Sequence, residues 1–264
     1  MCKYKNEIDK MCWSYSRLIS FENCKYEFYL NYIVNDADEY LPEGNYYAEV
    51  GNFVHEILAK ILEGKLAPNE ALCYYIDNFE NNVFYKTNQS IMDKTFETCA
   101  NYFSIVDFSF LKDYEILGIE KKIKVKIAGY NFIGFIDLLL RDKKDNKIII
   151  VDHKSSKYPF NKSGGIKKAA KSKFDSYKKQ MYLYSVYVKE KYNEFPKELV
   201  WNHFKDNKFA TIPFSKTEYN EIIKWFTDTI HTIEQEQDFY PNESNYFYCH
   251  NLCNFRNSCE YIAN

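Results

Sequence analysis

Residues 130–154, with the sequence YNFIGFIDLLLRDKKDNKIIIVDHK, decide the fold of this chain. The segments 130–141 and 147–153 are rich in apolar and β-branched residues, which predicts two strands, and the polar residues between them predict a turn. Ile148 to Val151 is an unbroken β-branched run, as expected of a central strand covered on both faces. The stretch therefore predicts the centre of a β-sheet.

Segments on both sides of this stretch supply further strands and helices. Period-2 and helical patterns predict a strand over 114–127, a β-hairpin over 199–213, two short helices that meet near Cys24 within 14–33, and helices over 47–62 (with Gly64 as a stop), 69–84, 90–111, 167–191 and 217–236. This order predicts an α/β fold in which helices flank a mixed central sheet. One domain is expected over 1–264, with a mainly helical part at 14–112, a core at 113–236 and a cysteine-rich tail at 237–264.

The charge of the chain limits how it could bind nucleic acid. Its formal net charge is -2, whereas domains that coat nucleic acid usually have a pI above about 9. A local basic run remains, in which seven lysines accompany the single acid Asp175: Lys162, Lys167, Lys168, Lys171, Lys173, Lys178 and Lys179. This run suits either a phosphate-contacting stripe or a solvated helix face.

No segment of the sequence predicts membrane insertion or export. The chain has no run of about 18 apolar residues, and its first residues, MCKYKN, lack the apolar core of a signal peptide. We therefore expect a cytoplasmic protein with no membrane partner. In a reducing compartment its eight cysteines are thiols or metal ligands before they are disulfides.

Three charged residues occupy strand positions where apolar residues are expected. Asp137 interrupts an apolar run. A buried, unpaired carboxylate costs several kcal/mol unless a cation neutralises it. Asp152 and Lys154 follow the buried run and point to the same side of an extended chain. Asp-x-Lys alone also suits a strand-end ion pair, but two carboxylates meet the needs of Mg²⁺, and a nearby lysine can act on the attacking water or on phosphate charge.

These positions resemble the split PD-(D/E)XK signature of RecB-like nucleases. The resemblance rests on Gly134-Phe135-Ile136-Asp137 followed by Ile149-Ile150-Val151-Asp152-His153-Lys154. It implies a restriction-endonuclease-like core in which Asp137 and Asp152 bind Mg²⁺ or Mn²⁺ and Lys154 positions the water. The backbone carbonyl of His153 is a further implied metal ligand, whereas its side chain is not.

Two helix motifs extend this resemblance. Gly51-Asn52-Phe53-Val54-His55 resembles the Gly-x-x-x-His motif of that branch, which implies that His55 helps to bind metal. Gln180-Met181-Tyr182-Leu183-Tyr184 resembles its Gln-x-x-x-Tyr motif, and the i, i+4 spacing puts Gln180 and Tyr184 on one helix face. These two would support the active centre or DNA, or else form a polar face over the sheet. Glu120 matches a frequent family glutamate, although a surface charge on a strand explains it equally well.

The C-terminal tail contains three closely spaced cysteines, Cys249, Cys253 and Cys259, and Cys24 is the candidate for a fourth ligand. The pattern resembles the iron–sulfur branch of the family, which includes the AddB nuclease domain and the CRISPR-adaptation exonucleases and implies a [4Fe–4S] cluster. The chain departs from that branch in having C-x₃-C rather than C-x₂-C, and Lys25 rather than proline after the first cysteine. Zinc and a disulfide are rivals. His250 could replace one cysteine, and Cys2, Cys12, Cys73 and Cys99 are expected to be ordinary thiols.

The resemblance implies a metal-dependent DNA nuclease, and specifically an exonuclease that acts on single-stranded DNA or DNA ends in recombination, repair or CRISPR adaptation. A Walker-A string is absent, so a helicase or other partner, or the substrate end, would supply direction. One alternative is a catalytically silent iron–sulfur subunit for DNA binding or assembly. Another is a hydrolase of RNA or nucleotides.

Overall fold

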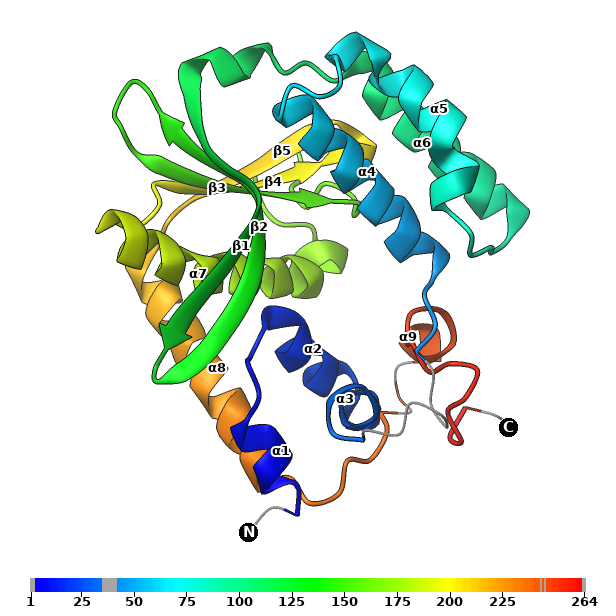
Figure 1. Cartoon of the computed structure of the whole chain (residues 1–264), viewed down its shortest axis with the longest axis vertical. Coiled ribbons are helices and arrows are strands. Elements are labelled where there is room, and N and C mark those ends of the chain that lie inside the picture. Colours follow the sequence, from blue (N-terminus) through cyan, green and yellow to red (C-terminus); the bar gives the residue numbers. More distant parts are fainter. Residues whose placement is uncertain (1–2, 35–41, 243, 245, 263–264) are drawn as a thin grey trace. The chain divides into compact units, whose positions relative to one another are not determined.

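The computed structural model describes residues 3–34, 42–242, 244 and 246–262 (Figure 1). The chain divides into two compact units, which are treated separately below. The first unit comprises Met1–Asn45, Lys124–Ile133 and Tyr219–Asn264, and the second comprises Tyr46–Ile123 and Gly134–Glu218. None of the described helices combines the length and the apolar character that crossing a bilayer requires.

A five-stranded mixed sheet forms the framework, as the sequence predicts. The strands are β1 (Tyr114–Ile127), β2 (Tyr130–Asp142), β3 (Ile148–Lys154), β4 (Glu198–His203) and β5 (Lys208–Pro213), and they lie in the order β1-β2-β3-β4-β5. β3 pairs antiparallel with β2 and parallel with β4, and β4 pairs antiparallel with β5. Between β1 and β2, Ala128 and Gly129 both have positive φ, the pattern of a type I′ hairpin turn.

The register of β2 on β3 brings two carboxylates together. Leu138 lies opposite Val151. One step further along each strand, Asp137 and Asp152 come next to each other. Successive residues of a strand face opposite sides, so these two carboxylates lie on the face of the sheet opposite to that of Leu138 and Val151. β3 is buried from Ile148 through His153, which makes it the central strand that its composition predicts.

Helices of the second unit flank this sheet. They are α4 (Tyr46–Leu62), α5 (Ala71–Asn82), α6 (Gln89–Ile105) and α7 (Lys171–Tyr192), with 3₁₀ turns η1 (Pro68–Glu70), η2 (Ser109–Asp113), η3 (Lys168–Ala170) and η4 (Phe204–Asp206). In Figure 1 the strands β3 to β5 lie between α7 on one side and α4 on the other. The apolar stripe of α4, which includes Val50, Phe53 and Ile57, is buried in a cluster with residues of α5 and α6. Gly64, with φ 71°, follows the end of α4 as predicted.

The first unit is mainly helical and contains α1 (Lys5–Asp9), α2 (Tyr15–Asn23), α3 (Lys25–Tyr32), most of α8 (Lys216–Gln235) and α9 (Tyr246–Asn251). The side chain of Ser14 caps α2 by accepting a hydrogen bond from the backbone N–H of Arg17. The extended backbone of Cys24 separates α2 from α3 and confirms the predicted break there. The residues expected to form the cysteine site thus all belong to this unit.

Candidate functional site

Three side chains from three elements converge in the second unit: His55 of α4, Glu120 of β1 and Asp137 of β2. The Nδ1 atom of His55 lies 3.6 Å from a carboxylate oxygen of each acid. One potential ligand atom from each residue lies within 4.8 Å of the others, and no other trio of His, Cys, Asp or Glu in the described part of the chain does this. An imidazole and two carboxylates form a donor set that suits a divalent cation.

Glu120 reaches this group through an unusual backbone conformation. Its φ is 42°, which lies in the left-handed region, and it sits inside β1. Such a conformation costs a non-glycine residue about 1–3 kcal/mol and is typical of functional sites. Sequence reasoning left Glu120 undecided between a ligand and a surface charge because a local change in strand geometry has no signal in residue type. The structure places its carboxylate beside His55 and Asp137.

The surroundings of Asp137 disfavour a negative charge on its carboxylate. Its side chain is buried, and its Oδ2 accepts a 2.6 Å hydrogen bond from the backbone N–H of His153. Burial, and then the charge of Asp152, raise the pKa of Asp137 from 3.8 to about 7 despite the opposing effect of His55 and Lys154. A cation would remove this penalty, so the electrostatics as well as the donor types fit a metal ion.

The imidazole of His55 is also tuned by its surroundings. Burial lowers its pKa, but the carboxylates of Glu120, Asp137 and Asp152 outweigh burial, and the pKa of His55 ends above its ordinary value. Its Nε2 atom lies 3.1 Å from the carbonyl oxygen of His153. A cation would therefore compete with a proton for His55.

Lys154 heads a line of hydrogen bonds that runs along α7. Its ammonium lies 2.7 Å from Asp152 and donates to Oε1 of Gln180 at 2.9 Å. The amide of Gln180 in turn donates to the hydroxyl of Tyr184 at 3.0 Å. Gly134 leaves room for this line, because a Cβ atom there would lie 2.5 Å from a ring carbon of Tyr184. The structure thus brings Asp152, Lys154, Gln180 and Tyr184 together.

The charge state of Lys154 limits what it can do. Burial lowers its pKa, but Asp152 and then Asp137 outweigh this effect, and the net pKa is raised. An ammonium with a raised pKa is a hydrogen-bond donor and a positive charge, not a base. It also lies 4.7 Å from the ring centre of Tyr177, a residue that sequence reasoning did not single out. The signal was available, since Tyr177 precedes Gln180 by three residues on one helix face.

His153 presents its backbone and its side chain to different surroundings. Its N–H and carbonyl contact Asp137 and His55, whereas its Nδ1 atom lies 3.1 Å from the amide nitrogen of Asn202. Burial, and then His55 and Lys154, lower the pKa of His153 well below its ordinary value, which keeps the ring neutral. The backbone of His153, and not its ring, therefore faces Asp137 and His55.

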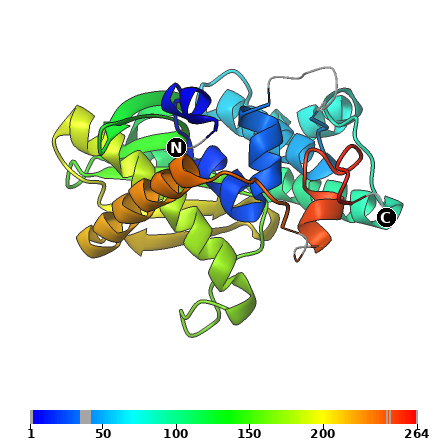
Figure 2. The ribbon, with the colours of Figure 1, turned by 90° about the horizontal axis from the view of Figure 1, so that it is seen from below.

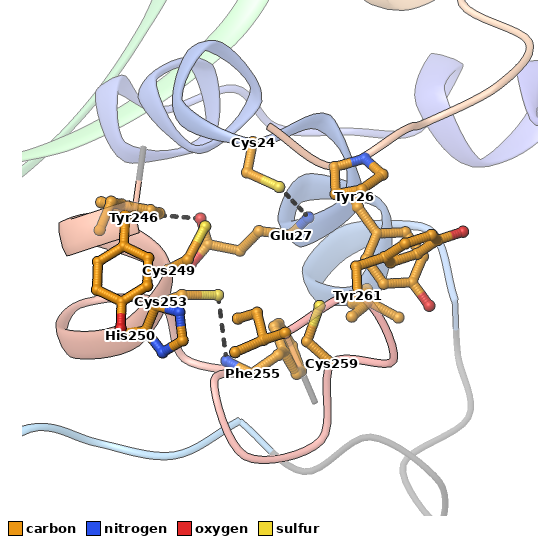
Figure 3. A pocket seen from close by; sticks show the side chains of 14 residues that line it. Cys24, Tyr26, Glu27, Tyr246, Cys249, His250, Cys253, Phe255, Cys259 and Tyr261 are labelled. Carbon is orange, nitrogen blue, oxygen red and sulfur yellow. Dashed lines mark hydrogen bonds between the residues drawn. The ribbon is translucent and has the colours of Figure 1, made fainter. Parts of the chain in front are cut away.

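A second candidate site lies in the first unit, where Cys24, Cys249, Cys253 and Cys259 line one cavity of about 200 Å³ (Figure 3). No three of these four described sulfur atoms lie within 4.8 Å of one another. A zinc ion with four thiolates at 2.3 Å requires sulfur atoms roughly 3.8 Å apart. The four cysteines thus surround one space but stand wider than a tetrahedral zinc site.

Backbone N–H groups point at two of these sulfurs. The sulfur of Cys24 accepts from the N–H groups of Glu27 and Asn242, both at 3.5 Å, and that of Cys253 accepts from the N–H of Phe255 at 3.4 Å. Such contacts favour thiolates, yet burial, and then the charge of Glu27, raise the pKa of Cys253 to about 12. Without a metal ion to displace its proton, Cys253 is therefore a neutral thiol at neutral pH.

Glu27 was missed by sequence reasoning, although it follows Cys24 by three residues. Its carboxylate is buried in the cavity wall and accepts a 2.5 Å hydrogen bond from the hydroxyl of Tyr248. His250 also lines the cavity. The seven cysteines in the described part of the chain are free thiols, so no disulfide forms among them, and Cys2 lies outside the described residues.

Comparison with known proteins identifies the family. No curated protein matches the sequence. A solved structure titled "Crystal structure of SSO0001" aligns with 93% of this chain and 96% of its own chain, at 16% identity and a TM-score of 0.31. Residues 12–260 match the PD-(D/E)XK nuclease superfamily. This range contains every site residue described above. The chain therefore belongs to the PD-(D/E)XK nuclease superfamily.

Proposed function

We propose that the chain hydrolyses DNA phosphodiester bonds with the help of Mg²⁺ or Mn²⁺. The observation that carries this proposal is the convergence of His55, Glu120 and Asp137 beside the ion pair of Asp152 and Lys154. We assign His55, Asp137, Asp152 and the carbonyl of His153 as metal ligands, and add Glu120 because its carboxylate belongs to the same group. When bound, a divalent cation polarises a phosphoryl oxygen and lowers the pKa of water.

Lys154 supplies positive charge to the reaction, and Gln180 and Tyr184 hold Lys154 in position. Lys154 holds a positive charge where negative charge develops on the phosphate, and its raised pKa favours this role over proton abstraction. Gln180 accepts one Lys154 hydrogen bond and so fixes the direction of the ammonium. Tyr184 orients the Gln180 amide and remains a neutral phenol, since burial raises its pKa to about 12.

We further propose that Cys24, Cys249, Cys253 and Cys259 hold a [4Fe–4S] cluster. Their common cavity supports a shared metal centre, and the resemblance to the iron–sulfur branch favours a cluster over zinc. The cluster would join helix α3 to the C-terminal tail within the first unit. It lies outside the proposed chemistry, and its contribution is to stability.

For the substrate we propose single-stranded DNA or DNA ends, as the resemblance to RecB-like nucleases implies. A helicase or recombination protein, or the substrate end itself, would supply direction. The opposed view, a silent iron–sulfur subunit for DNA binding or assembly, is disfavoured because Asp137, Asp152 and Lys154 are all present and adjacent.

The substrate proposal is tested with labelled linear single-stranded DNA, circular single-stranded DNA, duplex DNA and RNA. Each is incubated with purified protein in Mn²⁺ or in EDTA. We expect linear single-stranded DNA to be degraded in Mn²⁺ but not in EDTA, and circular single-stranded DNA to stay intact in both. Cleavage of circles would replace the exonuclease assignment by an endonuclease one, and inertness toward all four substrates in Mn²⁺ would support the silent subunit.

A further inference from the structure

A purely basic segment follows the catalytic strand directly. From Ser155 to Phe174 the chain contains no acidic residue and six lysines, although its overall charge is negative: Lys157, Lys162, Lys167, Lys168, Lys171 and Lys173. None of these six forms an ion pair with an acid in the described part of the chain, whereas Lys154 and Lys178, on either side of the segment, do. The segment therefore presents positive charge that the protein itself does not neutralise.

This segment is folded rather than loose. A β-bridge joins Phe160 to Ile166, and Oδ1 of Asn161 accepts hydrogen bonds from the N–H groups of Ser163 and Gly165. The ring of Phe160 packs 5.3 Å from that of Phe174, which anchors the turn on the start of α7. In Figure 2 the segment, in light green, projects beyond the beginning of α7. The lysines of the segment are thus attached to an ordered backbone.

A cavity of about 190 Å³ lies at the base of this segment. Lys157 and Lys173 line it, together with Ser156, Tyr177 and His203. His203 is only 1% exposed, and its Nδ1 atom lies 2.9 Å from the carbonyl oxygen of Ser156, which a ring N–H there satisfies. Its Nε2 atom is buried and has no hydrogen-bond partner among the described residues. The two lysine ammonium groups suit a phosphate, because charge-assisted hydrogen bonds to phosphate oxygens are strong. His203 is a neutral wall of the cavity, since burial lowers its pKa.

The cavity is connected to the candidate active site through one side chain. The ammonium of Lys154 lies 4.7 Å from the ring centre of Tyr177, and that of Lys173 lies 5.9 Å from the same centre. Lys154 and the cavity therefore share an aromatic wall. A nucleic acid strand whose phosphate lies at Lys154 can place a neighbouring phosphate in the cavity.

We propose that the cavity between Lys157 and Lys173 binds a phosphodiester of the substrate strand adjacent to the one that is cleaved. The lysines of the projecting segment extend this contact along the backbone of the strand. The inference rests on the proposed nuclease function and adds the path of the substrate. Because contacts to phosphates carry no base information, the site binds strands of any sequence.

The test compares two double variants. Lys157→Ala/Lys173→Ala removes both cavity lysines, and Lys94→Ala/Lys144→Ala removes two exposed lysines elsewhere in the same unit. Binding of a fluorescent oligothymidylate is measured by anisotropy in Ca²⁺, over a series of NaCl concentrations. Loss of the one phosphate that the cavity neutralises reduces the slope of log K against log salt by about 0.7 for a single strand. The control should keep the wild-type slope.

Hydrolysis of bis(p-nitrophenyl) phosphate in Mn²⁺ separates this inference from the proposed function, because this diester carries one phosphate and has no neighbouring phosphate for the cavity to bind. We expect the cavity variant to keep wild-type turnover of this diester. If the cavity variant is poorly folded, charge reversal at the exposed residues Lys168 and Lys171 replaces it, with the same expected loss of slope.

Parallel salt slopes for the cavity and control variants, or no binding of oligothymidylate by the wild type, would overturn the phosphate site. A reduced slope without hydrolysis of DNA or the small diester by the wild type would leave the site standing and reject the nuclease proposal. Hydrolysis of DNA and of the small diester by the wild type, with parallel salt slopes for the two double variants, would support the nuclease proposal and reject the phosphate site.

Discussion

Asp137→Asn should make the metal-free protein more stable while removing its response to metal. The pKa of Asp137 is raised from 3.8 to about 7, mainly by burial and by Asp152, so the folded state holds the proton more tightly than the unfolded state. The metal-free wild type therefore loses stability as the pH rises from about 4 through about 7. An amide cannot ionise, so the variant lacks this loss.

The magnitude follows from the pKa. A rise from 3.8 to about 7 corresponds to about 4 kcal/mol at about 1.36 kcal/mol per pH unit. The amide keeps the hydrogen bond from the His153 N–H only in a weaker, uncharged form. We therefore expect a net gain of about 1–3 kcal/mol at pH 8, which corresponds to roughly 3–10 °C in Tm for a chain of this size. At pH 4 the two proteins should be nearly equal.

Thermal unfolding in EDTA and in Mn²⁺, at pH 4, 6 and 8, measures both effects. In EDTA at pH 8 the Asp137→Asn protein should melt above the wild type. In saturating Mn²⁺ the order should reverse, because a ligand that binds only the folded wild type stabilises it by RT ln(1 + [L]/Kd). A variant that is less stable than the wild type in EDTA at pH 8, or that gains as much from Mn²⁺, would refute the reasoning.

Three further changes test separate parts of the account. Lys154→Met should lower turnover by roughly a hundredfold or more with little change in Mn²⁺ affinity measured by calorimetry, because Lys154 acts on transition-state charge; turnover within about twofold of wild type would reduce it to an ion-pair partner. Cys24→Ala should abolish the brown colour and the iron content of anaerobically purified protein and lower its Tm, whereas Cys73→Ala, at an exposed thiol, should change neither; zinc in place of iron would reassign the site. Gly134→Ala should cost about 1–3 kcal/mol by denaturant unfolding, because its Cβ would meet Tyr184 at 2.5 Å, and an unchanged midpoint would show that the ring yields freely.

Most of the fold could be predicted because its main elements are long and periodic. The strand predicted over 114–127 is β1 to the residue, β2 extends one residue beyond its predicted end, and β3 is shifted by one residue at both ends. The helix predicted over 90–111 ends instead at Ile105, because Asp107 accepts a hydrogen bond from the N–H of Ser109 and starts a separate 3₁₀ turn. The helices α1 and α9 are five and six residues long, too short to show a period, and were not predicted.

The candidate site could be predicted only where residue type and spacing carry the information. Asp137, Asp152 and Lys154 are visible as charges in apolar strands, and Gln180 as one end of an i, i+4 pair. The positive φ that brings Glu120 to His55 is a property of the folded strand, so the sequence left that residue undecided. The unpartnered nitrogen of His203 likewise depends on its neighbours in space.

The most direct test of the central claim is cleavage of labelled single-stranded DNA at saturating Mn²⁺ by the wild type, by Asp152→Ala and by the exposed control Asp77→Ala. Circular dichroism confirms that each protein is folded. The account predicts that the wild type and Asp77→Ala cleave, that EDTA stops both, and that Asp152→Ala is inactive. Undiminished cleavage by Asp152→Ala, or cleavage by the wild type that survives EDTA, would contradict it.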